Sequence, residues 1–184
     1  MLRLKDYIVR QETMLFLPKF DQLGNLFTVV MENDMEFCVE KSPKALMNAC
    51  LGYYGSSLRG ASDGAKTILG NIRMCPVLMN GILELYWFPT KSPDKKDCVW
   101  FALHHVKSYE RASVKETKVN LSNGVTVIVD VSLYTFKKKI QMAYQLKGKM
   151  EERSKLNPLM ILECKSRYHI RKMNGGVNYE KDVE

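Results

Sequence analysis

The hydrophobic pattern of this chain changes its period once, near residue 132, and this change determines the expected fold class. Before it, short runs rich in β-branched and aromatic residues alternate with turn residues, as strands and their connections do. After it, apolar residues recur every three or four positions, the spacing of one helix face: Leu133, Phe136, Ile140, Ala143, Leu146 and Met150. We therefore expect an α+β fold, with an antiparallel, partly barrel-like sheet over residues 5–131 and a long basic C-terminal helix near 132–153.

The strands of this sheet are expected to form successive hairpins. Residues 6–12 and 13–17 make one pair, and residues 25–31 and 35–40, joined by a polar turn at 32–34, make another. Further strands are predicted at 66–72, 77–80, 82–88, 99–103 and 106–109. The clearest hairpin joins 117–121 to 125–131 through Ser122-Asn123-Gly124, because Asn-Gly tolerates the positive φ that such turns need.

A short helix is expected after the first hairpins. Ser42 can cap it, Pro43 suits its first position, and apolar residues recur at helical spacing up to about residue 53. A glycine-rich stretch follows, and its end at Gly64-Ala65-Lys66-Thr67 faintly resembles a phosphate-binding loop. The glycine spacing differs from that motif, and a strand rather than a helix is expected next, so a surface loop is the simpler interpretation.

The charge of the chain is concentrated in one segment. The 28 Lys and Arg residues exceed the 20 Asp and Glu residues by 8, and residues 133–172 alone carry 11 basic and 3 acidic side chains. The rest of the chain is therefore neutral overall. On charge alone, a solvated helix face, a phosphate backbone, an RNA and an acidic protein are all open as interpretations of this basic segment. A membrane surface fits less well, because the helix lacks a broad Trp, Phe and Leu face.

Cysteines and histidines supply the residue types of a metal site or a nucleophile. Cys75, Cys98, His104 and His105 lie within one region, but no pair has zinc-finger spacing, and neighbouring residues of a strand face opposite sides. No recognisable Cys/His catalytic signature is present either. We read the five cysteines as reduced thiols and Trp100 with one histidine as packing residues. No secretory signal or span of roughly 20 apolar residues is found, so a cytoplasmic protein is expected.

Five short motifs occur in a fixed order along the chain. They are Tyr54-Gly-Ser-Ser57, the run from Lys66 to Pro76-Val-Leu, Trp87-Phe-Pro-Thr90 followed by a polar loop, Cys98-Val-Trp100 with Leu103-His-His-Val-Lys107, and Val119-Asn-Leu-Ser-Asn-Gly124. In this order and spacing, residues 7–150 resemble the ComK family of competence transcription factors.

The resemblance implies a non-enzymatic activator that binds specific DNA sequences, with no catalytic residue, metal or cofactor. Proteins of this family bind paired A/T-rich boxes, largely through the minor groove, as dimers that assemble further on DNA. They switch on DNA-uptake genes, which places the protein at the nucleoid with RNA polymerase, and an adaptor delivers them to a Clp protease. Narrow A/T minor grooves attract Arg and Lys. No helix-turn-helix signature is evident in the sequence, which suits a minor-groove reader.

The candidate DNA contacts are chosen from charge and loop chemistry. The phosphate-contacting candidates of the long helix are Lys137, Lys138, Lys139, Lys147 and Arg153, and the groove candidates of the glycine-rich stretch are Ser56, Ser57 and Arg59. We expect residues 1–156 to form a single DNA-binding domain and residues 157–184 a regulatory or activation tail that is partly disordered. Within this tail, the candidates for adaptor binding are Leu159, Met160, Ile161, Leu162 and Lys165.

Overall fold

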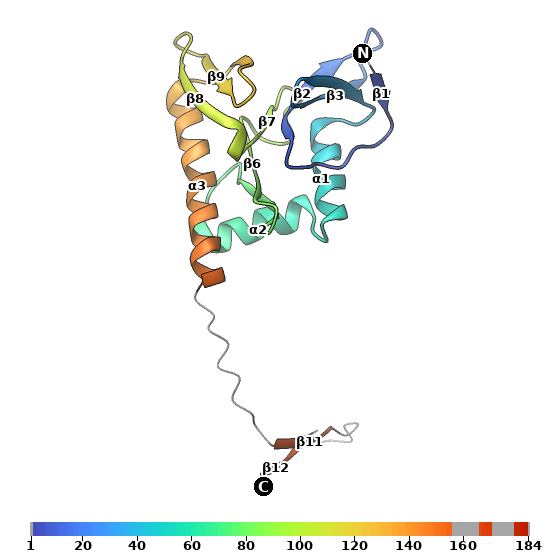
Figure 1. Cartoon of the computed structure of the whole chain (residues 1–184), viewed down its shortest axis with the longest axis vertical. Helices are drawn as coiled ribbons and strands as arrows, with labels where there is room; N and C mark the ends of the chain where they lie inside the picture. The colour runs from blue at the N-terminus through green and yellow to red at the C-terminus, as the bar shows by residue number, and fades with distance from the viewer. Residues whose placement is uncertain (1, 156–165, 171–178, 184) are drawn as a thin grey trace. The chain divides into compact units, whose positions relative to one another are not determined.

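The computed structural model describes residues 2–155, 166–170 and 179–183. The chain forms two compact units, residues 1–153 and 154–184. The first unit contains a seven-stranded sheet, a three-stranded sheet and three α-helices (Figure 1). In the second unit, β11 (Ser166–Ile170) pairs antiparallel with β12 (Tyr179–Val183), two strands that were not expected from the sequence.

The large sheet has the strand order β1-β4-β3-β2-β7-β6-β5. These strands span Leu2–Leu4 (β1), Thr13–Phe20 (β2), Leu26–Glu32 (β3), Met35–Val39 (β4), Val77–Asn80 (β5), Leu85–Pro89 (β6) and Trp100–Ala102 (β7). Neighbours pair antiparallel except β1 with β4, which are parallel. The α+β class and the large antiparallel sheet are confirmed, but the sheet is not closed, so the partly barrel-like form is not confirmed.

The small sheet has the order β10-β9-β8. Its strands are β8 (Val106–Arg111), which follows the short 3-10 helix η1 (Leu103–His105), then β9 (Thr117–Leu121) and β10 (Thr126–Val129). The predicted hairpin at 117–131 is confirmed, and Gly124 adopts φ +87° in its turn, a conformation that glycine reaches without strain.

Three helices cover the sheets. They are α1 (Pro43–Tyr53), α2 (Leu58–Leu69) and α3 (Leu133–Lys155). The predicted short helix and long basic helix are therefore confirmed. Two predicted strands are wrong: residues 66–72 lie mostly in α2, and residues 6–12 contain no strand, because this segment instead buries Tyr7 and Val9 beneath β4 and α1.

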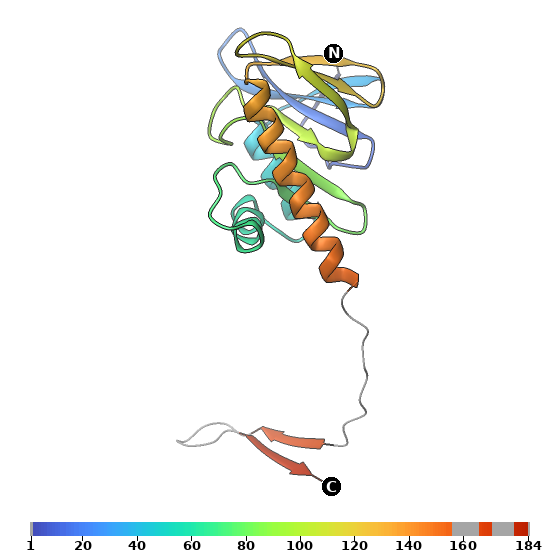
Figure 2. The same cartoon turned by 90° about the vertical axis from the view of Figure 1, so that its left-hand side faces the viewer.

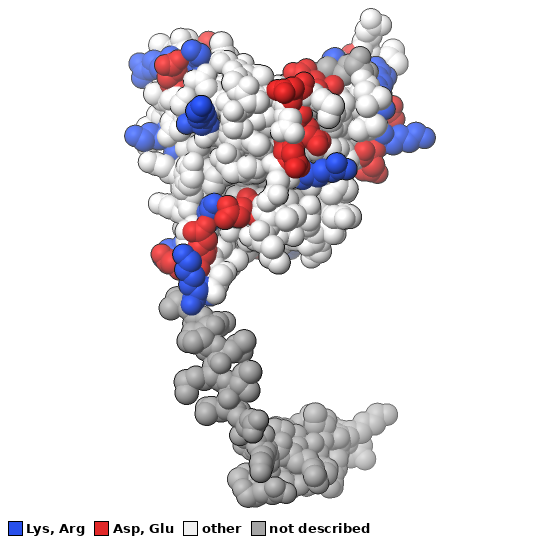
Figure 3. All heavy atoms as spheres, viewed as in Figure 1, with Lys and Arg blue, Asp and Glu red and all other residues white. Residues whose placement is uncertain are grey.

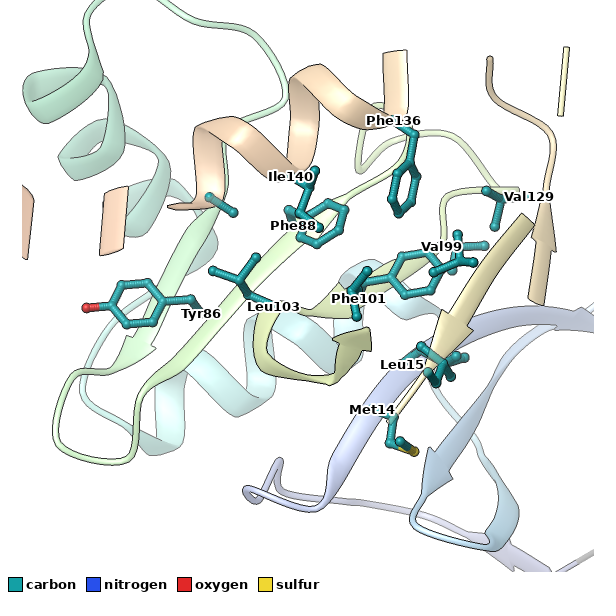
Figure 4. Packing of buried hydrophobic residues seen from close by; sticks show 14 of the residues in the cluster. Met14, Leu15, Tyr86, Phe88, Val99, Phe101, Leu103, Val129, Phe136 and Ile140 are labelled. Atoms are coloured by element: carbon teal, nitrogen blue, oxygen red, sulfur yellow. The ribbon is translucent and has the colours of Figure 1, made fainter. Parts of the chain in front are cut away.

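The two faces of the large sheet are both buried. Along β6, Leu85 and Trp87 pack in a cluster with α1, whereas Tyr86 and Phe88 face a second cluster that includes α3 and the small sheet (Figure 4). This alternation is the period of two that a strand imposes on its side chains. Burial on both faces explains why β6 is apolar throughout and why the strand pattern was readable in the sequence.

No α-helix in the described part of the chain is both long enough and apolar enough to cross a bilayer.

Candidate nucleic-acid interface

The long helix α3 is fixed to the domain by its first turns. At its start, the Ser132 hydroxyl lies 3.0 Å from that of Thr135 and accepts a 3.3 Å hydrogen bond from the Thr135 N–H. One turn later the fully buried Phe136 ring lies 5.6 Å from both Phe88 and Phe101 and 5.2 Å from Tyr109, measured between ring centroids (Figure 4). In the same cluster Ile140, Ala143 and Leu146 of the predicted apolar stripe are also buried, and the opposite side of the helix faces solvent.

The solvent side of the first turns of α3 carries positive charge, aromatic rings and amides. We call this surface the outer face and define it as Tyr134, Lys137, Lys138, Gln141, Tyr144 and Gln145, all of which are exposed. Their spacing of three and four residues places them along one side of the helix. Figure 2 shows α3 in front of the sheets, with no other element between the helix and the viewer. No carboxylate occurs in α3 before Glu151, and within the described residues neither Lys137 nor Lys138 forms an ion pair.

The last turns of α3 differ because two of their lysines already have carboxylate partners. Lys147 Nζ lies 2.7 Å from Glu84 of the β5–β6 turn and 3.6 Å from Glu151, and Lys149 Nζ lies 4.0 Å from Glu152. The hydrogen bond with Lys147 holds the pKa of Glu84 below its usual value and raises that of Lys147. Acidic and basic side chains accordingly alternate over this end of the helix (Figure 3). Arg153 is exposed there, between Glu152 and the helix end.

Lys139 is a correction to the predicted set of phosphate contacts. Only 5% of this residue is exposed, and its Nζ points inward, 3.4 Å from the Arg73 carbonyl oxygen and 3.5 Å from that of Met74. Burial lowers its pKa from 10.5 to about 8. Position 139 borders the apolar stripe, and the segment before β5 covers it, which no periodicity in α3 could reveal. We therefore do not place Lys139 at a DNA surface.

The predicted groove residues lie at a junction between two helices. α1 ends at Tyr53 and α2 begins at Leu58, so a turn of four residues joins them, with Gly55 at φ +80°. The Ser57 hydroxyl caps α2 by accepting a 3.0 Å hydrogen bond from the Gly60 N–H, and the Asn48 side chain accepts one from the Leu58 N–H. Two helices joined by a short turn are common in DNA-binding proteins. The sequence has no helix-turn-helix signature, yet the fold still contains two helices, α1 and α2, joined by a short turn.

The three residues at this junction are not equally available. The Ser57 hydroxyl already caps the helix, Ser56 is exposed, and the Arg59 side chain is 94% exposed with Asp63 as a weak partner 3.9 Å away. The structure places these residues on α2 and its leading turn and the lysines on α3, so the predicted contacts come from two elements. The aromatic and amide residues of the outer face were not predicted, although their positions on the side of the helix opposite the apolar stripe indicate that they face solvent.

The cysteines and histidines do not converge on one centre. Cys98 is 1% exposed, its thiol donates to the Lys91 carbonyl, and burial raises its pKa to about 11. His105 instead lies 2.6 Å from the Ser122 hydroxyl and 2.7 Å from the Gln11 carbonyl oxygen. Among the residues that the structure describes, no three His, Cys, Asp or Glu side chains are grouped as a metal site requires. The buried thiol is a poor nucleophile because the protonated form is favoured.

The predicted adaptor-binding residues, Leu159, Met160, Ile161, Leu162 and Lys165, lie outside the described residues.

Comparison with known proteins assigns most of the chain. A sequence model of the family described as ComK protein matches residues 4–155, which include every element of the first unit from β2 to α3. The Competence transcription factor of Bacillus subtilis (strain 168) is 25% identical over 150 residues, covering 82% of this chain and 78% of that protein. No solved structure matches the chain significantly.

Proposed function

The chain belongs to the ComK family, and from this premise we propose that it is a transcriptional activator of competence genes that binds double-stranded A/T-rich DNA. The single observation that carries this proposal, beyond the family, is the outer face of α3. It presents two exposed lysines with no carboxylate partner among the described residues, beside exposed tyrosines and glutamines. Such a surface binds a phosphate backbone by charge and places amide donors next to it.

The outer face supplies the general grip on DNA rather than the reading of a minor groove. An α-helix is about 10–12 Å wide with its side chains, whereas the minor groove of B-DNA is about 6 Å wide. We therefore propose that Lys137 and Lys138 contact phosphates from outside the groove. Arg59 and Ser56, which project from the α1–α2 junction, are the proposed groove contacts, since a narrow A/T groove attracts an exposed arginine.

The groove can be tested with inosine. An inosine–cytosine pair lacks the guanine amino group and so resembles A·T in the minor groove while resembling G·C in the major groove. We expect a duplex carrying inosine–cytosine boxes to compete for the protein nearly as well as an A/T duplex, and a G/C duplex to compete poorly, at about 150 mM salt. Equal competition by inosine–cytosine and G/C duplexes would contradict minor-groove reading.

Substitutions in the two proposed contact regions should have different effects on DNA binding. Arg59→Ala is expected to reduce the preference for A/T over G/C DNA, whereas Lys137→Ala with Lys138→Ala is expected to weaken binding to both sequences alike. Lys44→Ala is a suitable control, because this exposed α1 lysine is paired with Asp94 and lies outside both regions. If Arg59→Ala leaves the preference unchanged, Arg59 is not a groove contact.

Assembly and regulation are further parts of the proposal. Dimers on paired boxes should bind poorly when the box spacing changes by half a helical turn and recover after a full turn. RNA polymerase and a Clp-protease adaptor are proposed partners, the latter through 159–162 and Lys165.

The alternative function is binding of an RNA or an acidic protein by the same outer face. Competition by either ligand that equals competition by the A/T duplex would favour this alternative.

A further inference from the structure

A second cation-lined feature lies outside the outer face, in an open pocket of about 570 Å³. Its walls come from Ser62 and Lys66 of α2, from residues 71–75 before β5, and from Ser92-Pro93 in the β6–β7 connection. Figure 2 shows α2 end-on beside α3, with these connections above it. The polar residues that line the pocket are Ser62, Lys66, Asn71, Arg73 and Ser92.

The lining of this pocket is positively charged and contains no carboxylate. Lys66 has one acidic neighbour, Asp63 of its own helix, at 3.5 Å. Arg73 is exposed, and among the described residues no carboxylate lies within ion-pair distance of it. One carboxylate therefore offsets only part of the charge that these two side chains bring to the pocket.

A third cation lies directly behind the pocket wall. Within the described residues, the buried Lys139 ammonium contacts the carbonyl oxygens of Arg73 and Met74 at long distance and has no carboxylate partner, and both carbonyls belong to lining residues. The Cys75 thiol, also in the lining, is within the electrostatic reach of both Lys66 and Lys139. A buried ammonium without a counter-ion is costly, and an anion in the adjoining space would relieve that cost.

The chemistry of the lining identifies the anion. We propose that this pocket binds a phosphate group. The planar fork of Arg73 can donate two parallel hydrogen bonds to phosphate oxygens, Lys66 adds a point charge, and the Ser62 and Ser92 hydroxyls with the Asn71 amide supply neutral donors. The left-handed backbone of Met74, at φ +55°, is a conformation that ordinary residues hold only where the surroundings enforce it, and ligand sites are common places for it.

The phosphate could come from two sources, a phosphodiester of bound DNA or a free phosphate-bearing molecule. The first test is done without DNA and does not depend on the proposed function. The melting temperature of the full chain is measured with increasing inorganic phosphate against sodium chloride of matched ionic strength. We expect a saturable rise for the wild type and for the control Lys107→Ala, an exposed lysine on β8. Arg73→Ala and Lys66→Ala should each weaken the apparent phosphate affinity about tenfold.

A second variant separates the site from a general salt effect. Phosphate stabilises many proteins by exclusion from their surfaces, and this effect would be equal in every variant. Lys139→Met removes the charge behind the wall without replacing any lining residue, so it should also weaken phosphate binding. An equal rise in the wild type and in Arg73→Ala, or no rise in the wild type beyond that in chloride, would overturn the proposal.

DNA then distinguishes the two sources once phosphate binding is established. If Arg73→Ala also lowers affinity for the A/T duplex, and free phosphate competes with that duplex, the pocket holds a backbone phosphodiester. If Arg73→Ala leaves DNA affinity unchanged, the pocket holds a free phosphate-bearing ligand. Both results keep the phosphate site. A failure of DNA binding in the wild type as well as in every variant would count against the proposed function alone.

Discussion

Both ends of α3 carry several lysines, but the two ends differ in whether these lysines have carboxylate partners. In the first turns, Lys137 and Lys138 point to solvent with no ion pair among the described residues. In the last turns, Lys147 and Lys149 are matched to Glu84, Glu151 and Glu152. The number of cations on a helix therefore says little about binding. The positions of carboxylates on neighbouring elements decide which cations remain available for a phosphate.

Lys139 adds a third case within the same helix. It is adjacent to Lys138 in sequence, yet it is buried against the backbone of residues 73–74. Its charge acts on the interior and on the pocket beside it rather than on the outer face. Three consecutive lysines thus divide between a solvent surface and a buried site.

The largest expected effect comes from reversing the charge at the first end. Lys137→Glu with Lys138→Glu should weaken affinity for an A/T duplex by about 100-fold, because each variant side chain repels the phosphate that the lysine attracted. Fluorescence anisotropy at fixed salt measures the affinity, and an unchanged melting temperature shows that the fold is intact. Retention of wild-type affinity would remove the outer face from the interface.

Lys139→Met should act on stability. The methionine is expected to raise the free energy of unfolding near pH 7 by about 1–3 kcal/mol, because it replaces a buried, poorly paired ammonium. The folded pKa of Lys139, about 8, lies below its ordinary value of 10.5, so between these values the unfolded chain binds more protons. Wild-type stability from this group therefore rises with pH across that window, and the advantage of the variant should shrink.

Denaturant titrations near pH 7 and pH 9.5 measure this difference. Titration of the buried Cys75 and Cys98 thiols, whose pKa values are raised by burial, acts in the opposite direction. Because the Lys139 charge lowers the pKa of both thiols, the variant loses this effect too, and its stability should fall slightly more with pH, which also shrinks its advantage. A variant that is less stable near pH 7, or whose advantage grows with pH, would contradict the buried position of Lys139.

The aromatic rings of the outer face should have a moderate effect. Tyr134 is 78% exposed and Tyr144 53% exposed, so replacing both with alanine should change the free energy of unfolding by less than about 0.5 kcal/mol. DNA affinity should fall about fivefold, since aromatic side chains bury large areas at interfaces. Replacement of both by phenylalanine should restore most of the affinity. Equal DNA affinities of the alanine variant and the wild type would show that the two tyrosines do not contribute to the interface.

The smallest effect is expected at the second end of α3. Lys147→Ala with Lys149→Ala should change DNA affinity less than about twofold, because Lys147 is paired with Glu84 and Glu151 and the neighbouring Glu152 offsets part of the Lys149 charge. Stability should also change little, since exposed ion pairs contribute little to folding. A loss of affinity as large as that at the first end would remove the distinction between the two ends.

Local patterns predicted the parts of the fold that local chemistry determines. The strand at 77–80, the strand at 117–121 with its Asn-Gly turn, and the helix after Ser42 are found where they were expected. The helix α2 was missed because Gly60 and Gly64 read as a loop. Its stability depends on the Ser57 cap, on Asn48 from α1, and on the packing of Ala65 in the core. The parallel pairing of β1 with β4 is likewise set by tertiary contacts.

In the candidate site, too, only the features that depend on the helix's own sequence were predictable. The apolar stripe of α3 indicated that Lys137 and Lys138 face solvent, and the structure places them there. The burial of Lys139 depends on residues 73–74, and the pairing of Lys147 depends on Glu84. Both partners are more than 60 positions away in the sequence, so no pattern within the helix contains that information. The pocket proposed to bind phosphate is lined by three separate segments, so no continuous sequence motif describes it.

The salt dependence of DNA binding tests the central claim most directly, because its slope counts the phosphates that the protein neutralises. For the logarithm of affinity against the logarithm of salt, Lys137→Ala with Lys138→Ala should reduce the slope by about 1.8, or about 0.9 for each lost contact. Lys147→Ala with Lys149→Ala should leave the slope unchanged. An unchanged slope in the first variant, or an equal reduction in both, would contradict the account.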